Sequence, residues 1–90
     1  MNELKDYELI GLDEVDDYEN PNAIIHFKRL DGKAEWFVVA GDQQSNGDWL
    51  FFGIGDIICR EMGMFTLSEI IKYEGVEDTD WTPVPLYDLI

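Results

Sequence analysis

The fold follows from one stretch of sequence, AIIHFKRL (23–30), DG (31–32) and KAEWFVVA (33–40). The two outer runs are rich in β-branched and aromatic residues, and an Asp-Gly pair between such runs is a strong hairpin signal. The pair predicts a two-residue type I′ turn, in which both central residues take positive φ. We therefore expect two antiparallel strands joined at Asp31 and Gly32.

A third strand is predicted beyond the polar segment of residues 41–47. The run Asp48–Ile54 is apolar and aromatic. The sequence also allows this strand to continue past Gly55 as far as Cys59. In the second and third strands both alternating sets of side chains are apolar, as expected for strands that are covered on both faces. An antiparallel meander of three to five strands over residues 23–66 follows.

One short helix is predicted over residues 67–74. Thr66 and Glu69 form a Thr-x-x-Glu capping box, and Gly75 offers a C-terminal stop. About two turns of helix are marginal in water, so this helix must pack on the sheet. The fold class is therefore α+β, an antiparallel β-meander with one short α-helix packed on it.

The two chain ends complete a single domain of 90 residues. The acidic N-terminal segment, 1–22, has apolar spacing that leaves helix and strand both open. The closing segment, 75–90, is acidic, and its closely spaced prolines exclude a central strand. We expect both ends to wrap the sheet.

The negative charge is concentrated at these two ends. Twenty acidic residues against six basic ones give a formal net charge of −14. Residues 1–22 hold eight acids and one base, and residues 67–90 hold six acids and one base. Such a charge disfavours direct binding to nucleic acid or anionic lipid, because Lys and Arg capture both. If the partner is charged, we expect a basic protein surface.

The compartment is predicted from the single cysteine and the start of the chain. Cys59 cannot form an intramolecular disulfide, and its apolar neighbours indicate a small buried side chain. The sequence contains no apolar run of membrane-spanning length, and it begins with Met-Asn-Glu-Leu-Lys, unlike a signal sequence. We therefore expect a cytoplasmic protein that does not bind membranes.

Three blocks of sequence resemble a known family. They are Asp48-Trp-Leu-Phe-Phe-Gly53, Glu61-Met-Gly-Met-Phe-Thr-Leu-Ser-Glu-Ile70 and Trp81-Thr-Pro-Val-Pro-Leu86. Their content and order are similar to those of the domain of unknown function 2958 family, and the likeness runs from Asn20 to Leu89. Members are small proteins associated with plasmids and other mobile elements, so the resemblance implies that context. It implies no catalytic residue, because the family has no established activity.

Groups for catalysis or metal binding are scarce. His26 is the only histidine, and its predicted strand favours a partly buried structural role. One histidine and one cysteine cannot complete a four-ligand zinc site without recruiting carboxylates. The acidic run 13–19 lacks the spacing of a calcium loop, and Gly53-Ile-Gly55 lacks the third glycine of a dinucleotide motif. We expect no enzymatic activity, cofactor or specific metal site; weak divalent cation binding stays open.

The leading functional hypothesis is an acidic binding protein. Carboxylates along the two flanking segments imitate the charge spacing of a phosphate backbone. Together with the mobile-element context, this predicts an inhibitor or DNA mimic of a host nucleic-acid-binding or defence protein, such as a restriction or CRISPR protein. The predicted contact residues are Asp13, Glu14, Asp16, Asp17, Glu19, Glu74, Glu77, Asp78 and Asp80.

A second hypothesis places binding on an aromatic sheet face. One helix covers one face only, so Trp36, Trp49 and Phe51 form a binding patch if other segments leave them uncovered. The protein is then a structural or accessory module that binds a protein partner or itself, and its acidity serves solubility alone. The sequence leaves a monomer and a homodimer both open.

Overall fold

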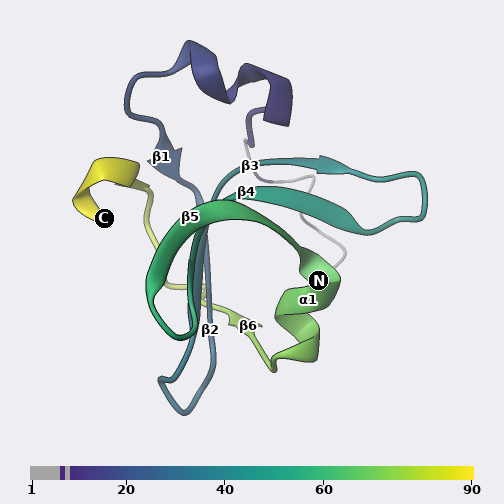
Figure 1. Cartoon of the computed structure of the whole chain (residues 1–90), viewed down its shortest axis with the longest axis vertical. Helices are drawn as coiled ribbons and strands as arrows, with labels where there is room; N and C mark the ends of the chain where they lie inside the picture. Colours follow the sequence, from purple (N-terminus) through teal and green to yellow (C-terminus); the bar gives the residue numbers. More distant parts are fainter. Residues whose placement is uncertain (1–6, 8) are drawn as a thin grey trace.

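A computed structural model describes Tyr7 and residues 9–90 of the chain (Figure 1). A five-stranded antiparallel sheet has the order β5-β4-β3-β2-β6, and a separate two-stranded ribbon joins β1 and β7. With one short α-helix, the fold is α+β as predicted. The elements are η2 (Leu12–Asp17), β1 (Asn22–Ala23), β2 (Ile25–Lys28), β3 (Glu35–Gln43), β4 (Trp49–Asp56), β5 (Arg60–Thr66), α1 (Leu67–Lys72), β6 (Val76–Glu77), β7 (Val84–Pro85) and η3 (Leu86–Asp88), where η marks a 3₁₀ helix.

The hairpin β2–β3 forms in the predicted register, but its turn differs from the prediction. Pairing of Lys28 with Glu35 centres the hairpin on the Asp-Gly pair. The loop is four residues long, because the last ladder contact is the Arg29 N–H donating to the Ala34 carbonyl at 3.0 Å. Only Gly32 takes positive φ, 78°. The wider loop confines the left-handed conformation to the residue that has no Cβ.

A second hairpin joins β4 and β5. β4 ends at Asp56, short of Cys59, so the strand does not continue as far as the sequence allowed. The next three residues form a turn, and β5 then pairs with β4 from Asp56 opposite Arg60 to Leu50 opposite Thr66. Figure 1 shows β5 curving around the space beside α1. β5 is therefore the long edge strand of the sheet.

Both faces of the central strands are covered, as predicted. On one face Trp36 and Phe51 pack with Ile70 of α1 in a buried cluster. On the other face Phe37 packs with Leu86 of η3. The closing segment thus supplies the second cover that a single short helix cannot provide.

α1 begins directly after the predicted N-cap residue, Thr66, and Glu69 contacts the Thr66 hydroxyl. The Thr66 hydroxyl oxygen accepts a hydrogen bond from the N–H of Glu69 at 3.2 Å. The same hydroxyl donates to the Glu69 carboxylate at 3.2 Å. These contacts satisfy one of the N–H groups that the first turn of a helix leaves unpaired.

The end of α1 is a Schellman turn, two residues short of the predicted bound. The N–H of Gly75 donates to the Ile70 carbonyl at 2.8 Å, and the N–H of Glu74 donates to the Ile71 carbonyl at 2.9 Å. Glu74, not the glycine, takes the left-handed conformation, with φ 64°. Gly75 is needed for space, because a Cβ there would lie 2.8 Å from Cζ3 of Trp36.

The sequence left helix and strand both open for the N-terminal segment. In its described part, the structure has a short 3₁₀ helix, η2. Ile10 bridges to Ala40 of β3, and η2 follows it directly. Residues 1–6 and 8 of the predicted segment lie outside the described residues. At the other end, β7 belongs to the small ribbon and not to the main sheet, as expected for its proline content.

Candidate binding surface

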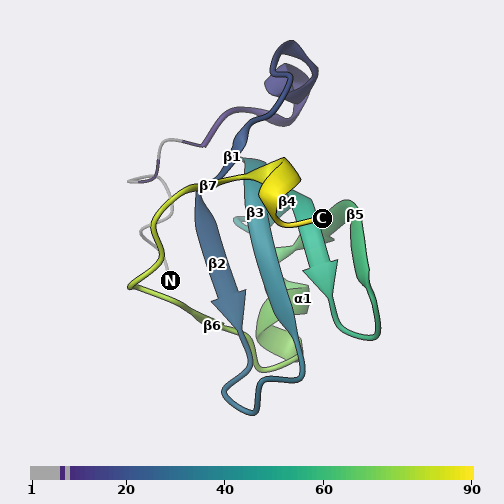
Figure 2. The same cartoon turned by 90° about the vertical axis from the view of Figure 1, so that its left-hand side faces the viewer.

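The first predicted acidic group lies on and beside η2. In both Figure 1 and Figure 2, η2 stands at the upper end of the molecule, above the sheet. All members are exposed, and none forms a salt bridge with a basic residue of the described chain. This η2 acidic group consists of Asp13, Glu14, Asp16, Asp17 and Glu19.

The second predicted acidic group lies on and around β6. Figures 1 and 2 place this segment in the lower half of the molecule, away from η2. The sheet therefore separates the two groups, and the nine predicted carboxylates do not form one continuous surface. The β6 acidic group consists of Glu74, Glu77, Asp78 and Asp80.

Three carboxylates of the β6 acidic group contact neighbouring side chains, and the contact of Asp78 with His26 is described below. Glu74 lies 3.4 Å from Nη2 of Arg29. The Tyr7 hydroxyl donates a hydrogen bond to the Glu77 carboxylate, and this bond raises the pKa of Tyr7 to about 12. Of these two contacts, only the one with Arg29 offsets negative charge of the group, because the tyrosine hydroxyl is neutral.

His26 is buried and lies between Asp78 of the β6 acidic group and Glu35 of β3. Its Nδ1 is 2.8 Å from Oδ2 of Asp78, and its Nε2 is 3.0 Å from Oε1 of Glu35. The ring stacks on Phe37 with centroids 4.7 Å apart, and Trp81 packs beside it at 4.8 Å. Both polar contacts are hydrogen bonds only when each ring nitrogen carries a proton. The hydrogen bond from His26 lowers the pKa of Asp78.

The same polar cluster continues to Arg60. The guanidinium lies 3.6 Å from Glu35 and 3.1 Å from Asp56, and it sits over the Phe37 ring at 5.1 Å. The cluster thereby connects β2, β3, β4, β5 and the segment after β6. His26 is 5% exposed and does not line the groove described below. The histidine is therefore more deeply buried than the sequence predicted, and both of its ring nitrogens contact carboxylates.

The aromatic patch of the second hypothesis does not form on the surface, and that prediction is wrong. Trp36 is 2% exposed and Phe51 is 0% exposed, because α1 covers the sheet face that they occupy. Trp49 is half-buried and stacks on Phe51, with centroids 6.1 Å apart. These rings are core residues. The closing segment covers the opposite face of the sheet, where Phe37 packs with Leu86.

Exposed apolar side chains gather instead on the β4–β5 hairpin. Ile58, in the turn, is 96% exposed, and Cys59 beside it is exposed, so the prediction of a buried thiol is wrong. The sequence carried a signal for this turn in the charged pair Asp56 and Arg60, which brackets the apolar run. We call the four exposed side chains the hairpin patch: Ile57, Ile58, Met62 and Met64.

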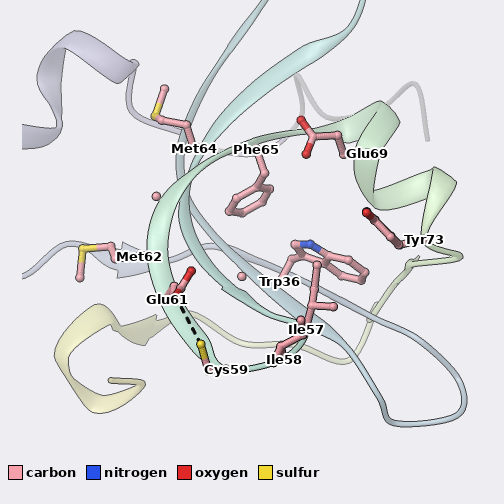
Figure 3. A pocket seen from close by; sticks show the side chains of 12 residues that line it. Trp36, Ile57, Ile58, Cys59, Glu61, Met62, Met64, Phe65, Glu69 and Tyr73 are labelled. Atoms are coloured by element: carbon pink, nitrogen blue, oxygen red, sulfur yellow. Dashed lines mark hydrogen bonds between the residues drawn. The ribbon is translucent and has the colours of Figure 1, made fainter.

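A groove of about 500 Å³ lies between this hairpin and α1 (Figure 3). Trp36 and Phe65 lie inside the curve of β5, and Tyr73 closes the groove from the helix side. Ile57 stands at the end formed by the hairpin turn. A Cβ at Gly63 would meet no atom within 4 Å, so this glycine leaves space beside the strand. The groove is therefore open and largely apolar.

β5 presents apolar surface on its other face as well. Figure 3 shows Met62 and Met64 pointing away from the groove, and they are 45% and 53% exposed. β4 is the only strand paired with β5 among the described residues, so the outer edge of β5 is open there. Its sequence, REMGMFT, contains no proline, and its charged residues, Arg60 and Glu61, stand together at its start, so residues 62–66 lack the charges and prolines with which natural edge strands prevent unwanted pairing.

Two carboxylates line the groove without a salt bridge to the described chain. Glu61 accepts a hydrogen bond from Sγ of Cys59 at 3.3 Å, and this contact raises the pKa of the Cys59 thiol. Glu69 is held by the helix cap. The wall of the groove thus combines the exposed Tyr73 ring and apolar side chains with two carboxylates.

Comparisons with protein-family models, curated proteins and solved structures gave no match for this chain. The resemblance to the domain of unknown function 2958 family stays a prediction. Within Tyr7 and residues 9–90, no three His, Cys, Asp or Glu side chains are grouped so as to hold a metal ion. None of the helices described in that part of the chain has the length and apolar character needed to cross a bilayer.

Proposed function

We propose that the protein is a non-catalytic binding module that docks a protein partner on the hairpin patch and the adjoining groove. The observation that carries this proposal is the gathering of exposed apolar side chains beside an open strand edge and an apolar groove. Contiguous exposed apolar surface on a small protein marks an interaction site. The burial of His26 outside the groove supports a role without catalysis.

The charge of the chain favours a basic partner. A net charge of −14 attracts basic surfaces over several ångströms and raises the rate of encounter at low salt. Exposed charges are largely screened beyond about 8 Å at physiological ionic strength. We assign steering to the two acidic groups and contact to the hairpin patch.

The test is quantitative capture from host lysate at low salt with matched variants. Met64→Lys places a charge in the hairpin patch, and Leu30→Lys makes the same change at an 85% exposed residue in the β2–β3 turn. Recovery of a specific partner should fall about tenfold, or about 1.4 kcal/mol, with Met64→Lys only. Equal recovery by the wild type and both variants would contradict the proposal.

A second candidate function is DNA mimicry by the η2 acidic group. Five exposed carboxylates on and beside one short helix support it, as does their lack of a salt bridge to the described chain. Because the β6 acidic group lies elsewhere, this mimicry uses the η2 group alone. Its partner is the basic groove of a host nucleic-acid-binding or defence protein.

The same capture experiment separates this candidate from the first. A variant with Asn or Gln at Asp13, Glu14, Asp16 and Asp17 loses the partner if η2 docks it. Excess duplex DNA then competes for the partner, and Met64→Lys has no effect. Capture that survives both the η2 variant and the DNA rules out mimicry.

A further inference from the structure

We infer that an extended basic segment of the partner adds to the outer edge of β5 as a further strand and places an apolar side chain in the groove. This inference rests on the proposed function and specifies both the chemistry of the partner and the way it binds. Three observations carry it: the length of the open edge, the shape of the groove and the charges around it.

The edge of β5 is long enough to hold an added strand. β5 has seven residues, whereas the opposite edge strand, β6, has two. Alternate residues of an edge strand turn their N–H and C=O groups outward, and a new strand satisfies them with main-chain hydrogen bonds. Natural edges are often protected by charged residues, and on β5 these are Arg60 and Glu61, its first two residues. The one cation on β5, Arg60, is held by Asp56 at 3.1 Å, which leaves the rest of the edge accessible.

The groove supplies a position for one side chain of that strand. Successive side chains of an added strand point alternately to the two faces of the sheet. Gly63 lines the groove together with Trp36, Phe65 and Tyr73, and a Cβ on it would meet no atom within 4 Å. On the other face, the apolar side chains of Met62 and Met64 are half-exposed. A strand with an aliphatic side chain on the groove face and lysine stems along the methionines buries both surfaces.

The charges select a basic segment over a second copy of this chain. Glu61 and Glu69 line the groove without a salt bridge to the described chain, and the chain has a net charge of −14, so the surroundings of the edge attract a cationic strand as a whole. A second copy would bring another net charge of −14 to the same surface. Like charges at that density oppose self-association.

The test uses a fluorescent seven-residue parent peptide of alternating Lys and aliphatic residues, and two N-methylated derivatives of it that are isomers of each other. One isomer carries N-methyl groups on its Lys amides and the other on its aliphatic amides, so each blocks one edge of the extended peptide. Fluorescence anisotropy at low salt gives each dissociation constant. We expect one isomer to bind like the parent and the other at least about tenfold more weakly, because only one edge faces β5.

A structural readout and matched variants complete the test. Amide hydrogen exchange of residues 60–66 should slow in the parent complex, which side-chain docking alone would not produce. Met64→Lys should weaken the parent peptide, and Leu30→Lys should leave its affinity unchanged. Gly63→Val should also weaken it, because the new side chain has space in the fold but fills the groove.

Three results would overturn the inference. Equal affinity of all three peptides refutes strand addition but leaves docking on the hairpin patch intact. Failure of the parent peptide to bind refutes a basic strand, and the proposed function is then decided by the lysate capture. A dimer in gel filtration that Met64→Lys converts to a monomer makes a second copy the occupant of the edge.

Discussion

Two adjacent residues at the end of α1 should respond in opposite directions to substitution. Glu74 is a non-glycine residue with a left-handed φ of 64°. Gly75 lacks a positive φ, but a Cβ on it would lie 2.5 Å from Cγ2 of Ile70 and 2.8 Å from Cζ3 of Trp36. Glu74→Gly therefore stabilises the protein, and Gly75→Ala destabilises it.

The magnitudes follow from these contacts. Glu74→Gly removes a steric cost of about 1–2 kcal/mol and adds an entropic cost of about 0.5–1 kcal/mol. The lost contact with Arg29 matters little, because the Glu74 side chain is 78% exposed. The net gain is about 0.5–1 kcal/mol. Gly75→Ala forces Trp36 or Ile70 to move and costs about 1–3 kcal/mol of unfolding free energy.

Thermal unfolding followed by circular dichroism measures both effects. Each kcal/mol moves the melting temperature of a domain of this size by about 4–8 °C. Glu74→Gln is the control, because it removes the charge and keeps the strained backbone. An unchanged melting temperature for Gly75→Ala would refute the packing argument. A gain from Glu74→Gln equal to that from Glu74→Gly would assign the effect to charge.

Three further predictions concern the packing of the sheet, the loss of stability at low pH and the effect of salt on the highly charged fold. Gly53→Ala should prevent folding, since its Cβ would lie 1.9 Å from the Phe37 carbonyl oxygen; a native-like amide spectrum would refute this. The lowered pKa of Asp78 gives stability above the unfolded-state pKa that is lost as the pH falls through the folded-state value. Urea midpoints from about pH 6 to pH 2 should thus fall less steeply in Asp78→Asn than in the wild type, and parallel curves would contradict this. Screening of the charge of −14 should raise the melting temperature between about 10 and 150 mM salt, against which a flat or falling midpoint would count.

The core of the sheet was predictable because its signals are local. The Asp-Gly pair and the apolar runs on either side fix the register, since a shift of one residue would turn every side chain to the wrong face. Thr66 and Glu69 likewise mark the start of α1. The turn type was not predictable from the pair alone, because it depends on where the last ladder hydrogen bond forms, here at Arg29.

The candidate site was less predictable because it depends on which segments meet in space. The alternation in β3 shows that both faces are covered, but not that α1 lies over Trp36 and the closing segment over Phe37. The sequence predicted that acidic residues near the two chain ends contact one partner together, but in the structure the sheet separates the two groups. The apolar run that ends at Cys59 is too short for its hydrophobic periodicity to distinguish a strand from an exposed turn.

Site-specific photo-crosslinking is the most direct test of the hairpin patch as the docking surface. A photoreactive amino acid replaces Met64 in the patch or, as the control, Leu30 in the β2–β3 turn, where the side chain is 85% exposed. In host lysate at low salt, we expect one discrete crosslinked product from position 64 and none from position 30. Equal products from both positions, or no product from position 64, would contradict docking on the β4–β5 hairpin.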